Sequence, residues 1–293
     1  MNRPKKIRKP FLCTSVIVLT MMASTHSFAQ TLQVMSFNIR YDNPQDGENR
    51  WDNRKKNLAS MLRFYEVDLC GMQEALIHQI RDLKAALPEY EYIGKGRDDG
   101  REAGEFSPIF YRKDRIRVLE SGTFWLSPSP DTPSRGWDAM LPRVVTWAKI
   151  KTIKGNKTAY VFNTHYDHMG EIARRESSNL LLRKIAEMAG KSRVVVTGDF
   201  NAIPSQDPIR ILLDTSNPGH LTDTESLTRQ EHFGPYSTFN GFEAMEQEGR
   251  HIDYIFLKNF KKMQVLRHGT LSNTWSGRFA SDHHAVLAEL SLK

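Results

Sequence analysis

The residues of this chain that could do chemistry lie at or near the ends of short apolar runs. Six runs carry a carboxylate, an amide or an imidazole there: Asn38, Glu74, His165 with Asp167, Asp199 with Asn201, Asp253, and Asp282 with His283. Because strand ends are where side chains of a sheet protein can converge in one crevice, these groups could share a single site. Their donor atoms are mostly oxygens and no cysteine joins them, so the set favours Mg²⁺ or Mn²⁺ over zinc.

Two of these segments, taken alone, also have ordinary structural explanations. The GDFN segment at 198–201 makes a good turn after a strand. Glu74 would be favoured at the start of a helix, where the helix dipole stabilises a negative charge. The functional hypothesis therefore depends on the combination of segments.

The last two segments restrict which of their own residues can take part. Neighbouring residues of a strand point to opposite faces, so only one of His283 and His284 can join a shared site. We assign His283 to the site and His284 to the structure. Asp253 would be a buried acid in the apolar strand HIDYIFL. Such a charge is costly unless it is paired, and a histidine is its natural partner.

The elements that must position these groups follow from the hydrophobic pattern. Eight apolar, β-branched runs bounded by turn residues predict strands: 32–39, 67–73, 107–112, 143–150, 158–165, 193–200, 251–257 and 285–292. Three sets of residues each share a helical face: Leu58, Met61, Leu62 and Tyr65; Ile77, Ile80, Leu83 and Leu87; Leu181, Leu182, Ile185 and Met188. The alternation predicts an α/β fold with sheets covered by helices.

Residues 1–29 have the pattern of a secretory signal peptide. Five basic residues from Arg3 to Lys9 precede the apolar run FLCTSVIVLTMMA, and small residues follow at Ser27 and Ala29. The apolar run is shorter than the roughly 20 residues that a membrane span needs. We therefore expect export to the periplasm or the extracellular space without a membrane anchor.

Removal of this leader changes the charge balance. The chain has 41 lysines and arginines against 34 acids; the leader takes five basic residues and no acids, which leaves 36 against 34, or +2. A protein that grips nucleic acid by its phosphates usually has a basic surface, which this total does not show. Cys70 is the one cysteine that remains, so no internal disulfide is expected. Residues 30–293 contain no linker and are expected to form a single domain.

In chain order, six segments resemble the endonuclease/exonuclease/phosphatase superfamily, which includes deoxyribonuclease I, deadenylases, inositol phosphatases and sphingomyelinases. These segments are FNIR, QEA, NTHYDH, GDFN, IDYIF and SDHHAV, and they span essentially all of the chain after the leader. The resemblance implies a four-layer sandwich of two packed mixed β-sheets flanked by helices, with the active site at one edge. It also implies hydrolysis of a phosphoester bond with Mg²⁺ or Mn²⁺ as cofactor.

The resemblance further implies a role for each matching residue. Glu74 and Asn38 would hold the metal, and Asp282 would serve the metal or the attacking water. Asp199 would orient and deprotonate that water. His165 would contact the phosphate or assist the leaving group, and Asn201 would position the phosphate or the nucleophile. Asp253 and His283 would form a dyad that stabilises the charge developing on the phosphate. Whether an aspartate or a histidine is the general base stays open.

Several further residues are candidates for contact with the substrate. Some nucleases of the family carry an acid two residues after the first asparagine, where this chain has Arg40. A cation there could bind a phosphate, and we add Asp167 to the same group. The loop FWLSPSPDTPSRGWDAMLPR could supply Trp137 and Arg143, as well as Trp125 and Arg135. The aromatic segment GPYSTFNGF at 234–242 could also border the site.

The segment RYDNPQDGENRW, residues 40–51, raises the question of a calcium loop. An EF-hand loop beginning at Asp42 would need an oxygen ligand where Pro44 stands and a glutamate where Asn53 stands, so that pattern fails. We interpret the segment as a structured turn that borders the site and leads into a helix near Trp51.

Four functions remain open on the sequence alone. The preferred one is a secreted nuclease or phosphodiesterase, and the alternative is a phosphatase of a small phosphorylated metabolite such as a sugar phosphate. A phospholipid headgroup hydrolase and a non-catalytic binding protein on the same scaffold are further alternatives. The expected partner is the phosphoester substrate alone, with a monomeric protein and no stable protein partner.

Overall fold

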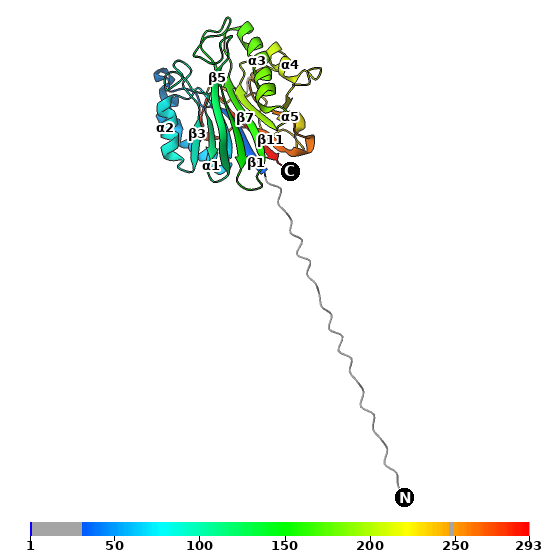
Figure 1. Cartoon of the computed structure of the whole chain (residues 1–293). Coiled ribbons are helices and arrows are strands. Elements are labelled where there is room, and N and C mark those ends of the chain that lie inside the picture. The colour runs from blue at the N-terminus through cyan, green and yellow to red at the C-terminus, as the bar shows by residue number, and fades with distance from the viewer. Residues whose placement is uncertain (2–30, 246–248, 293) are drawn as a thin grey trace.

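Two six-stranded β-sheets dominate the computed structural model, which describes residue 1 and residues 31–245 and 249–292 (Figure 1). The first sheet has the order β11 (Val265–Leu271), β14 (Ala285–Ser291), β1 (Thr31–Asn38), β2 (Leu69–Gln73), β4 (Ile109–Arg112) and β3 (Tyr90–Ile93). The second sheet has the order β5 (Ile116–Trp125), β6 (Val144–Thr152), β7 (Thr158–His165), β8 (Val194–Asp199), β10 (Asp253–Lys258) and β9 (Thr222–Asp223). A small hairpin pairs β12 (Thr274–Trp275) with β13 (Arg278–Phe279).

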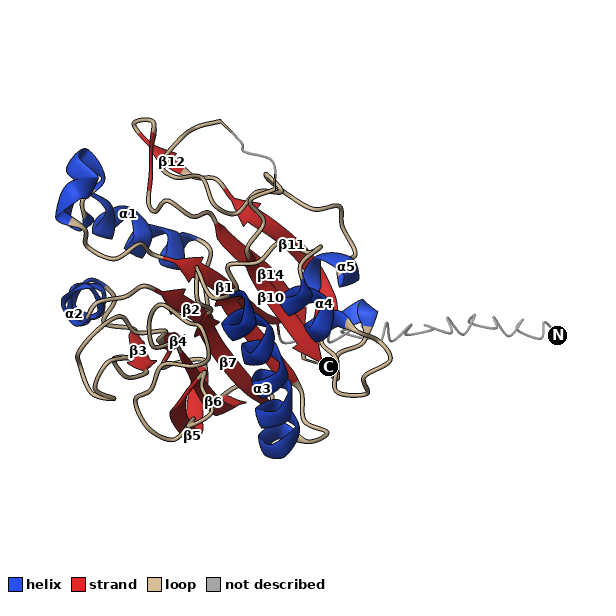
Figure 2. Cartoon of the chain, turned by 90° about the horizontal axis from the view of Figure 1, so that it is seen from above, coloured by secondary structure: helices blue, strands red, loops and turns tan. Residues whose placement is uncertain are grey.

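Helices cover the outer face of each sheet, so the molecule has four layers (Figure 2). The helices α1 (Trp51–Phe64) and α2 (Ile77–Ala86) lie on the first sheet, and α3 (Glu171–Ala189) and α4 (Asp207–Leu213) lie on the second. The short elements are α5 (Thr224–Leu227) and the 3₁₀ helices η1 (Pro44–Asn49) and η2 (Lys262–Gln264). The predicted four-layer sandwich is confirmed.

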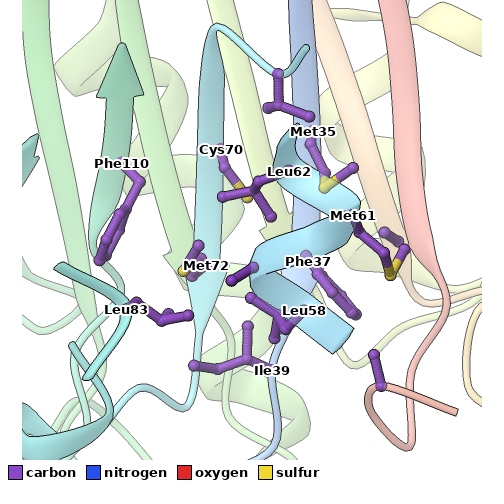
Figure 3. Close-up of a cluster of buried hydrophobic side chains, with 14 of the residues drawn as sticks. Met35, Phe37, Ile39, Leu58, Met61, Leu62, Cys70, Met72, Leu83 and Phe110 are labelled. Atoms are coloured by element: carbon purple, nitrogen blue, oxygen red, sulfur yellow. The ribbon is translucent and has the colours of Figure 1, made fainter. Parts of the chain in front are cut away.

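The central strands are apolar on both faces because each face meets a different layer. On β1, Met35 and Phe37 pack against α1, where Leu58 and Leu62 point toward the sheet (Figure 3). The alternate residue Val34 belongs to the core between the two sheets. This explains why the run LQVMSFNI shows no polar face.

The sheet interior changes from apolar to polar toward the edge that carries the site. The side chain of Asn163 on β7 donates to the carbonyl oxygens of Met72 at 2.6 Å and Pro108 at 2.9 Å. Its oxygen accepts from Gln73 at 2.7 Å and from Thr197 at 2.9 Å. The bonds from Asn163 to Met72, Pro108 and Gln73 join the two sheets and fix their relative position behind the site.

One glycine is required for that close approach of the two sheets. A Cβ atom on Gly71 would lie 2.0 Å from the Thr197 hydroxyl oxygen and 2.4 Å from the Asn163 side-chain oxygen. Both distances are far below van der Waals contact, so a larger residue at 71 would push the sheets apart.

Strand register brings the predicted site residues to one edge. In the parallel pair β1–β2, Asn38 lies opposite Gln73, the residue before Glu74. In the parallel pair β7–β8, His165 lies opposite Asp199, and the antiparallel strand β10 places Asp253 opposite Asp199 from the other side. The six strand ends therefore converge.

All eight predicted strands are present, and α1, α2 and α3 contain the three predicted helical faces except for Tyr65 and Leu87, which follow the last residues of α1 and α2. The predicted signal peptide, residues 1–29, lies outside the described residues. Among the residues that the structure describes, no helix combines the length and the hydrophobicity of a membrane span.

Candidate active site

A cavity of about 650 Å³ opens at the edge where the strand ends converge. Its lining is dominated by charged and aromatic side chains: Arg40, Tyr41, Glu74, Glu105, Leu141, Arg143, His165, His168, Asp199, Asn201, Phe239, Arg250, Ile252, Asp282 and His283. This volume is typical of a small-molecule site. Most of the residues that the sequence predicts as site residues line this cavity.

Asp199 occupies the centre of the site. It is 1% exposed, and its Oδ2 atom accepts a hydrogen bond of 2.9 Å from the side-chain amide of Asn38. The same amide donates to Glu74 Oε1 at 3.0 Å. Burial and the nearby charge of Asp253 raise the pKa of Asp199 to about 7. A carboxylate with a pKa near neutrality is suited to accept a proton in catalysis.

Asp253 and His283 form a buried ion pair beside Asp199. The distance from His283 Nδ1 to Asp253 Oδ2 is 2.8 Å, and His283 Nε2 lies 3.8 Å from Asp199 Oδ2. Burial opposes protonation of His283, but the carboxylates of Asp253, Asp199 and Asp282 outweigh it and raise the pKa to about 10. The imidazole is therefore a cation at neutral pH, directed at the cavity by Asp253.

His165 and Asn201 form the opposite side of the site. The Asn201 side-chain nitrogen donates to the Tyr166 carbonyl oxygen at 3.0 Å and lies 3.0 Å from His165 Nε2. Because that nitrogen is the donor, the neutral imidazole carries its proton on Nδ1, 4.0 Å from Glu105 Oε2. Burial and the charges of Arg143 and Arg97 lower the pKa of His165 well below its usual value. His165 is therefore neutral at physiological pH.

The side chain of Arg143 also lines the cavity. It is 4% exposed; its Nε atom lies 3.4 Å from Asp167 Oδ2, and its Nη2 lies 3.0 Å from His168 Nδ1. Within the described residues, its Nη1 has no hydrogen-bond partner. A buried cationic donor without a partner is costly, and an anion in the cavity would supply the missing acceptor.

Arg40 lies at the rim and is held by its own loop. Its guanidinium makes two hydrogen bonds of 2.9 Å with Asp46, and its Nε atom is 3.7 Å from Asp282 Oδ2. Asn43 caps η1 by accepting from the Gln45 amide. The segment 40–51 is therefore a structured turn at the border of the cavity, as predicted.

Three residues of the site adopt left-handed backbone conformations within two residues of a strand end. The φ angles are 56° at Arg40, 62° at Glu74 and 47° at Asn201. Such conformations are uncommon for residues other than glycine and cluster at functional sites. Here they turn each side chain back into the cavity at the point where its strand ends.

The donor set fits a divalent cation. Atoms of Glu74, Asp199 and His283 lie within 4.8 Å of one another. His283 is protonated at neutral pH and offers no lone pair, so the two carboxylates are the members that can hold a hard cation. Asn38 differs from the expectation of an oxygen ligand: its amide nitrogen faces both carboxylates, and its oxygen accepts from the Arg40 amide at 3.0 Å. Asp282 lies beside Arg40 in the lining.

Two predicted substrate contacts do not line the cavity. Asp167 accepts hydrogen bonds from the backbone amides of Met140, Met169 and Gly170, and although burial opposes this, they hold its pKa down to about 2. It therefore positions Arg143 and a loop. Trp137 packs against the hydrophobic core between the second sheet and its covering helices. Neither prediction of substrate contact agrees with this geometry.

Two other residues of the same loop also lie away from the cavity lining. Trp125 is buried and donates its indole N–H to the Arg97 carbonyl oxygen at 2.7 Å. Arg135 is exposed to solvent. The loop therefore contributes Leu141 and Arg143 to the lining, while its tryptophans serve packing.

Several lining residues were missed at the sequence level. Glu105 and Arg250 carried no signal, because a charged residue in a loop is ordinary, while Tyr41 and His168 lie in the segments RYDNPQDGENRW and NTHYDH but were given no role of their own. Phe239 lies in the segment GPYSTFNGF, which was expected to border the site. His284 packs its ring against Phe279, consistent with the structural role that strand alternation predicted.

Comparison with known proteins gives a consistent result. A family model described as the Endonuclease/Exonuclease/phosphatase family matches residues 35–283. The solved structure of the endonuclease/exonuclease/phosphatase from Bacteroides vulgatus is 42% identical with a TM-score of 0.84, and the match covers 90% of this chain and 100% of that one. The mannosyl-6-phosphatase of Bacteroides thetaiotaomicron VPI-5482 is 36% identical with a TM-score of 0.83, covering 88% and 99%.

A curated relative is more distant. Tyrosyl-DNA phosphodiesterase 2 of Danio rerio is 25% identical over 244 residues. The match covers 80% of this chain and 60% of that protein, so the chain spans less than two thirds of that relative.

Proposed function

The chain belongs to the endonuclease/exonuclease/phosphatase family and is a phosphoester hydrolase, and from that premise we propose that it removes phosphate from a small phosphorylated carbohydrate. The observation that carries the proposal is the buried Nη1 atom of Arg143, which has no hydrogen-bond partner among the described residues and belongs to a side chain that lines a cavity of about 650 Å³. Arg40 and Arg250 line the same space. A compact dianion, such as a phosphomonoester group, would satisfy these donors together.

Two further observations support a phosphomonoester over a nucleic acid. The relative that is 36% identical over 88% of this chain is named a mannosyl-6-phosphatase. The balance of 36 basic and 34 acidic residues after position 29 gives little long-range attraction for a polymer of phosphates. These two observations favour a phosphatase over the nuclease that the sequence alone suggested.

In the proposed reaction, a water oxygen bonds to phosphorus and the bond from phosphorus to the sugar oxygen breaks. Asp199 accepts the proton of the attacking water, and Asn38 and the Asn201 amide hold that carboxylate by hydrogen bonds of 2.9 Å each. The imidazolium of His283 stabilises the negative charge that develops on the phosphate oxygens. The leaving sugar oxygen takes up a proton from solvent, so the products are inorganic phosphate and a free sugar hydroxyl.

The carboxylates of Glu74 and Asp199 would hold the divalent cation, which we propose to be Mg²⁺ or Mn²⁺. When bound, it neutralises phosphate oxygens and so favours attack by a nucleophile. Without it, the four acids in the lining face three arginines and the imidazolium of His283, so the lining has no excess of positive charge: Glu74, Glu105, Asp199 and Asp282 against Arg40, Arg143, Arg250 and His283. Such a balance leaves the cavity poorly suited to an anion until a cation is added.

We also propose that residues 1–29 direct export and that residues 30–293 act as a single, monomeric domain in the periplasm or outside the cell. The support is the order of basic, apolar and small residues in the leader.

A direct comparison of substrates tests the proposed function. The full chain, with Mg²⁺ or Mn²⁺, is expected to release phosphate from mannose 6-phosphate or a methyl mannoside 6-phosphate at a kcat/KM at least about 100-fold above that for bis(p-nitrophenyl) phosphate. Plasmid nicking and RNA trimming are measured on the same preparation. Efficient cleavage of either polymer with no release from sugar phosphates would instead establish the nuclease alternative, for which Tyr41 and Phe239 could stack bases.

Arg40 provides a second test, on substrate binding. Replacement of Arg40 by alanine is expected to raise KM for the phosphomonoester by about 10- to 100-fold, since a hydrogen bond to a charged group contributes about 1.5–3 kcal/mol. The matched control is Arg50→Ala in the same loop, because Arg50 pairs with Asp42 and lies outside the cavity lining. An Arg40→Ala enzyme with unchanged KM and kcat would assign Arg40 to the loop alone.

A further inference from the structure

A second group of metal-ligand residues lies outside the catalytic cavity. It consists of Glu225 on α5, His232 in the following loop and His268 on β11, and their ligand atoms lie within 4.8 Å of one another. None of the three lines the catalytic cavity. We propose that these residues bind a transition-metal ion, with zinc as the best match to two imidazoles and a carboxylate.

Hydrogen bonding directs the imidazole lone pair of His232 toward the ring of His268. His232 Nε2 lies 3.1 Å from the Pro235 carbonyl oxygen, which can only accept. The neutral ring therefore carries its proton on Nε2 and its lone pair on Nδ1. That Nδ1 atom faces Nδ1 of His268. A histidine that binds a metal characteristically donates its other N–H to a carbonyl or carboxylate in this way.

The separation of the two nitrogens agrees with shared coordination. His232 Nδ1 and His268 Nδ1 are 3.2 Å apart. Two nitrogens bound tetrahedrally to zinc at 2.0–2.1 Å would be separated by about 3.3 Å. A direct N–H···N hydrogen bond would give a similar distance, so the carboxylate of Glu225 beside the two rings is the observation that favours a metal ion. The carboxylate supplies the third ligand and the negative charge that a divalent cation requires.

A second overlapping group extends the site. Asp223, Glu225 and His251 also bring ligand atoms within 4.8 Å of one another. His251 Nδ1 lies 2.8 Å from the Tyr236 carbonyl oxygen, so its Nε2 carries the lone pair. Glu225 is common to both groups, so His251 and Asp223 are the candidates for a fourth ligand.

The proposed metal site lies between β11 and the loop that leads to Phe239. His268 is 4% exposed on β11, while His232 belongs to the loop that leads to Phe239. A backbone hydrogen bond also joins this loop to β11: the Thr270 amide donates to the Phe233 carbonyl oxygen at 2.8 Å. A metal ion would fasten this loop to the first sheet and so help hold Phe239 at the catalytic cavity.

Metal binding to the full chain tests the proposal without reference to activity. A Glu74→Gln background removes one carboxylate of the catalytic group, and equilibrium dialysis with Zn²⁺ is expected to retain one ion per chain there. Adding His232→Ala or Glu225→Gln is expected to weaken Zn²⁺ binding by at least about 100-fold. Loss of a residue that only hydrogen-bonds a ligand typically costs about 10- to 100-fold in metal affinity, and loss of the ligand itself should cost more. Co²⁺ as a spectroscopic probe should show tetrahedral absorption bands that the same changes abolish.

The control is His78→Ala, a half-exposed histidine in neither group, which should leave Zn²⁺ binding unchanged. Thermal melting followed by circular dichroism verifies that each variant is folded. His268→Ala is a third variant, but His268 is buried, so His232 and Glu225 decide the outcome. Absence of Zn²⁺ from the Glu74→Gln protein, or unchanged affinity after both changes, would overturn the proposal.

Discussion

Replacement of Asp199 by asparagine is expected to lower kcat for phosphoester hydrolysis by about 1,000-fold, within the 10²–10⁴ range typical of a general base. Asparagine keeps the size of the side chain but cannot accept a proton. Asp199 is the carboxylate best placed for this role because Asn38 and the Asn201 amide orient it at the centre of the cavity. Steady-state kinetics with the phosphomonoester substrate measure the effect.

The pH dependence gives the same prediction a second measurement. The pKa of Asp199 is about 7, so kcat/KM of the unmodified enzyme should rise as pH increases through neutrality. A cation bound at Glu74 would move that limb to lower pH, because positive charge favours the carboxylate form. The residual activity of Asp199→Asn should lack this limb.

Asp207→Asn is the matched control, since Asp207 is an exposed acid at the start of α4. It should keep full activity. Equilibrium dialysis with Mn²⁺ separates loss of the base from loss of the cation. An Asp199→Asn enzyme that is folded and retains more than a tenth of the original kcat would exclude Asp199 as the base.

The fold was largely predictable because its central strands are buried on both faces. Runs such as LQVMSFNI and RVVVTGDF are apolar, β-branched and ended by turn residues, and each forms a strand whose ends lie within one residue of the prediction. Strands near the sheet margins were not predicted. The segment IRVLESGTFW of β5 leaves several residues exposed, so its hydrophobic pattern is weak. β11 contains Arg267 and His268, which interrupt its apolar run.

The site was predictable where polar groups end an apolar strand. Such residues as Asn38, Asp199 and Asp253 stand out against their neighbours, and strand register then brings them together. Glu105 could not be found in this way, because it follows a loop rich in charges and meets Arg97 only in three dimensions. Asp167 resembled a site residue because it is polar and follows β7, yet its partners are backbone amides of a neighbouring loop.

The Asp253–His283 pair supports the second large prediction, which concerns stability. Replacement of Asp253 by asparagine is expected to lower the free energy of unfolding by about 3–5 kcal/mol near pH 6, because one partner of a buried ion pair is left without its counter-charge. Asp253 is fully buried and lies 2.8 Å from His283. Urea denaturation at a series of pH values measures the loss.

The sign of the pH dependence follows from the pKa of His283. Its folded value of about 10 is above the unfolded value of about 6.5, so protonation of His283 stabilises the native state fully below pH 6.5. This contribution is lost as pH rises from 6.5 through 10. The difference in unfolding free energy between the unmodified protein and Asp253→Asn should therefore be largest near pH 6 and should shrink toward pH 9.5.

A buried acid paired with arginine provides the control for this pH dependence. Asp68 is 1% exposed and lies 3.3 Å from Arg115, which does not titrate in this range. Asp68→Asn should destabilise the protein by a similar amount at pH 6 and pH 9.5. Because both variants remove a buried carboxylate, only the titration of His283 distinguishes them. A loss that is equal at both pH values for Asp253→Asn would show that His283 is not held as a cation by Asp253.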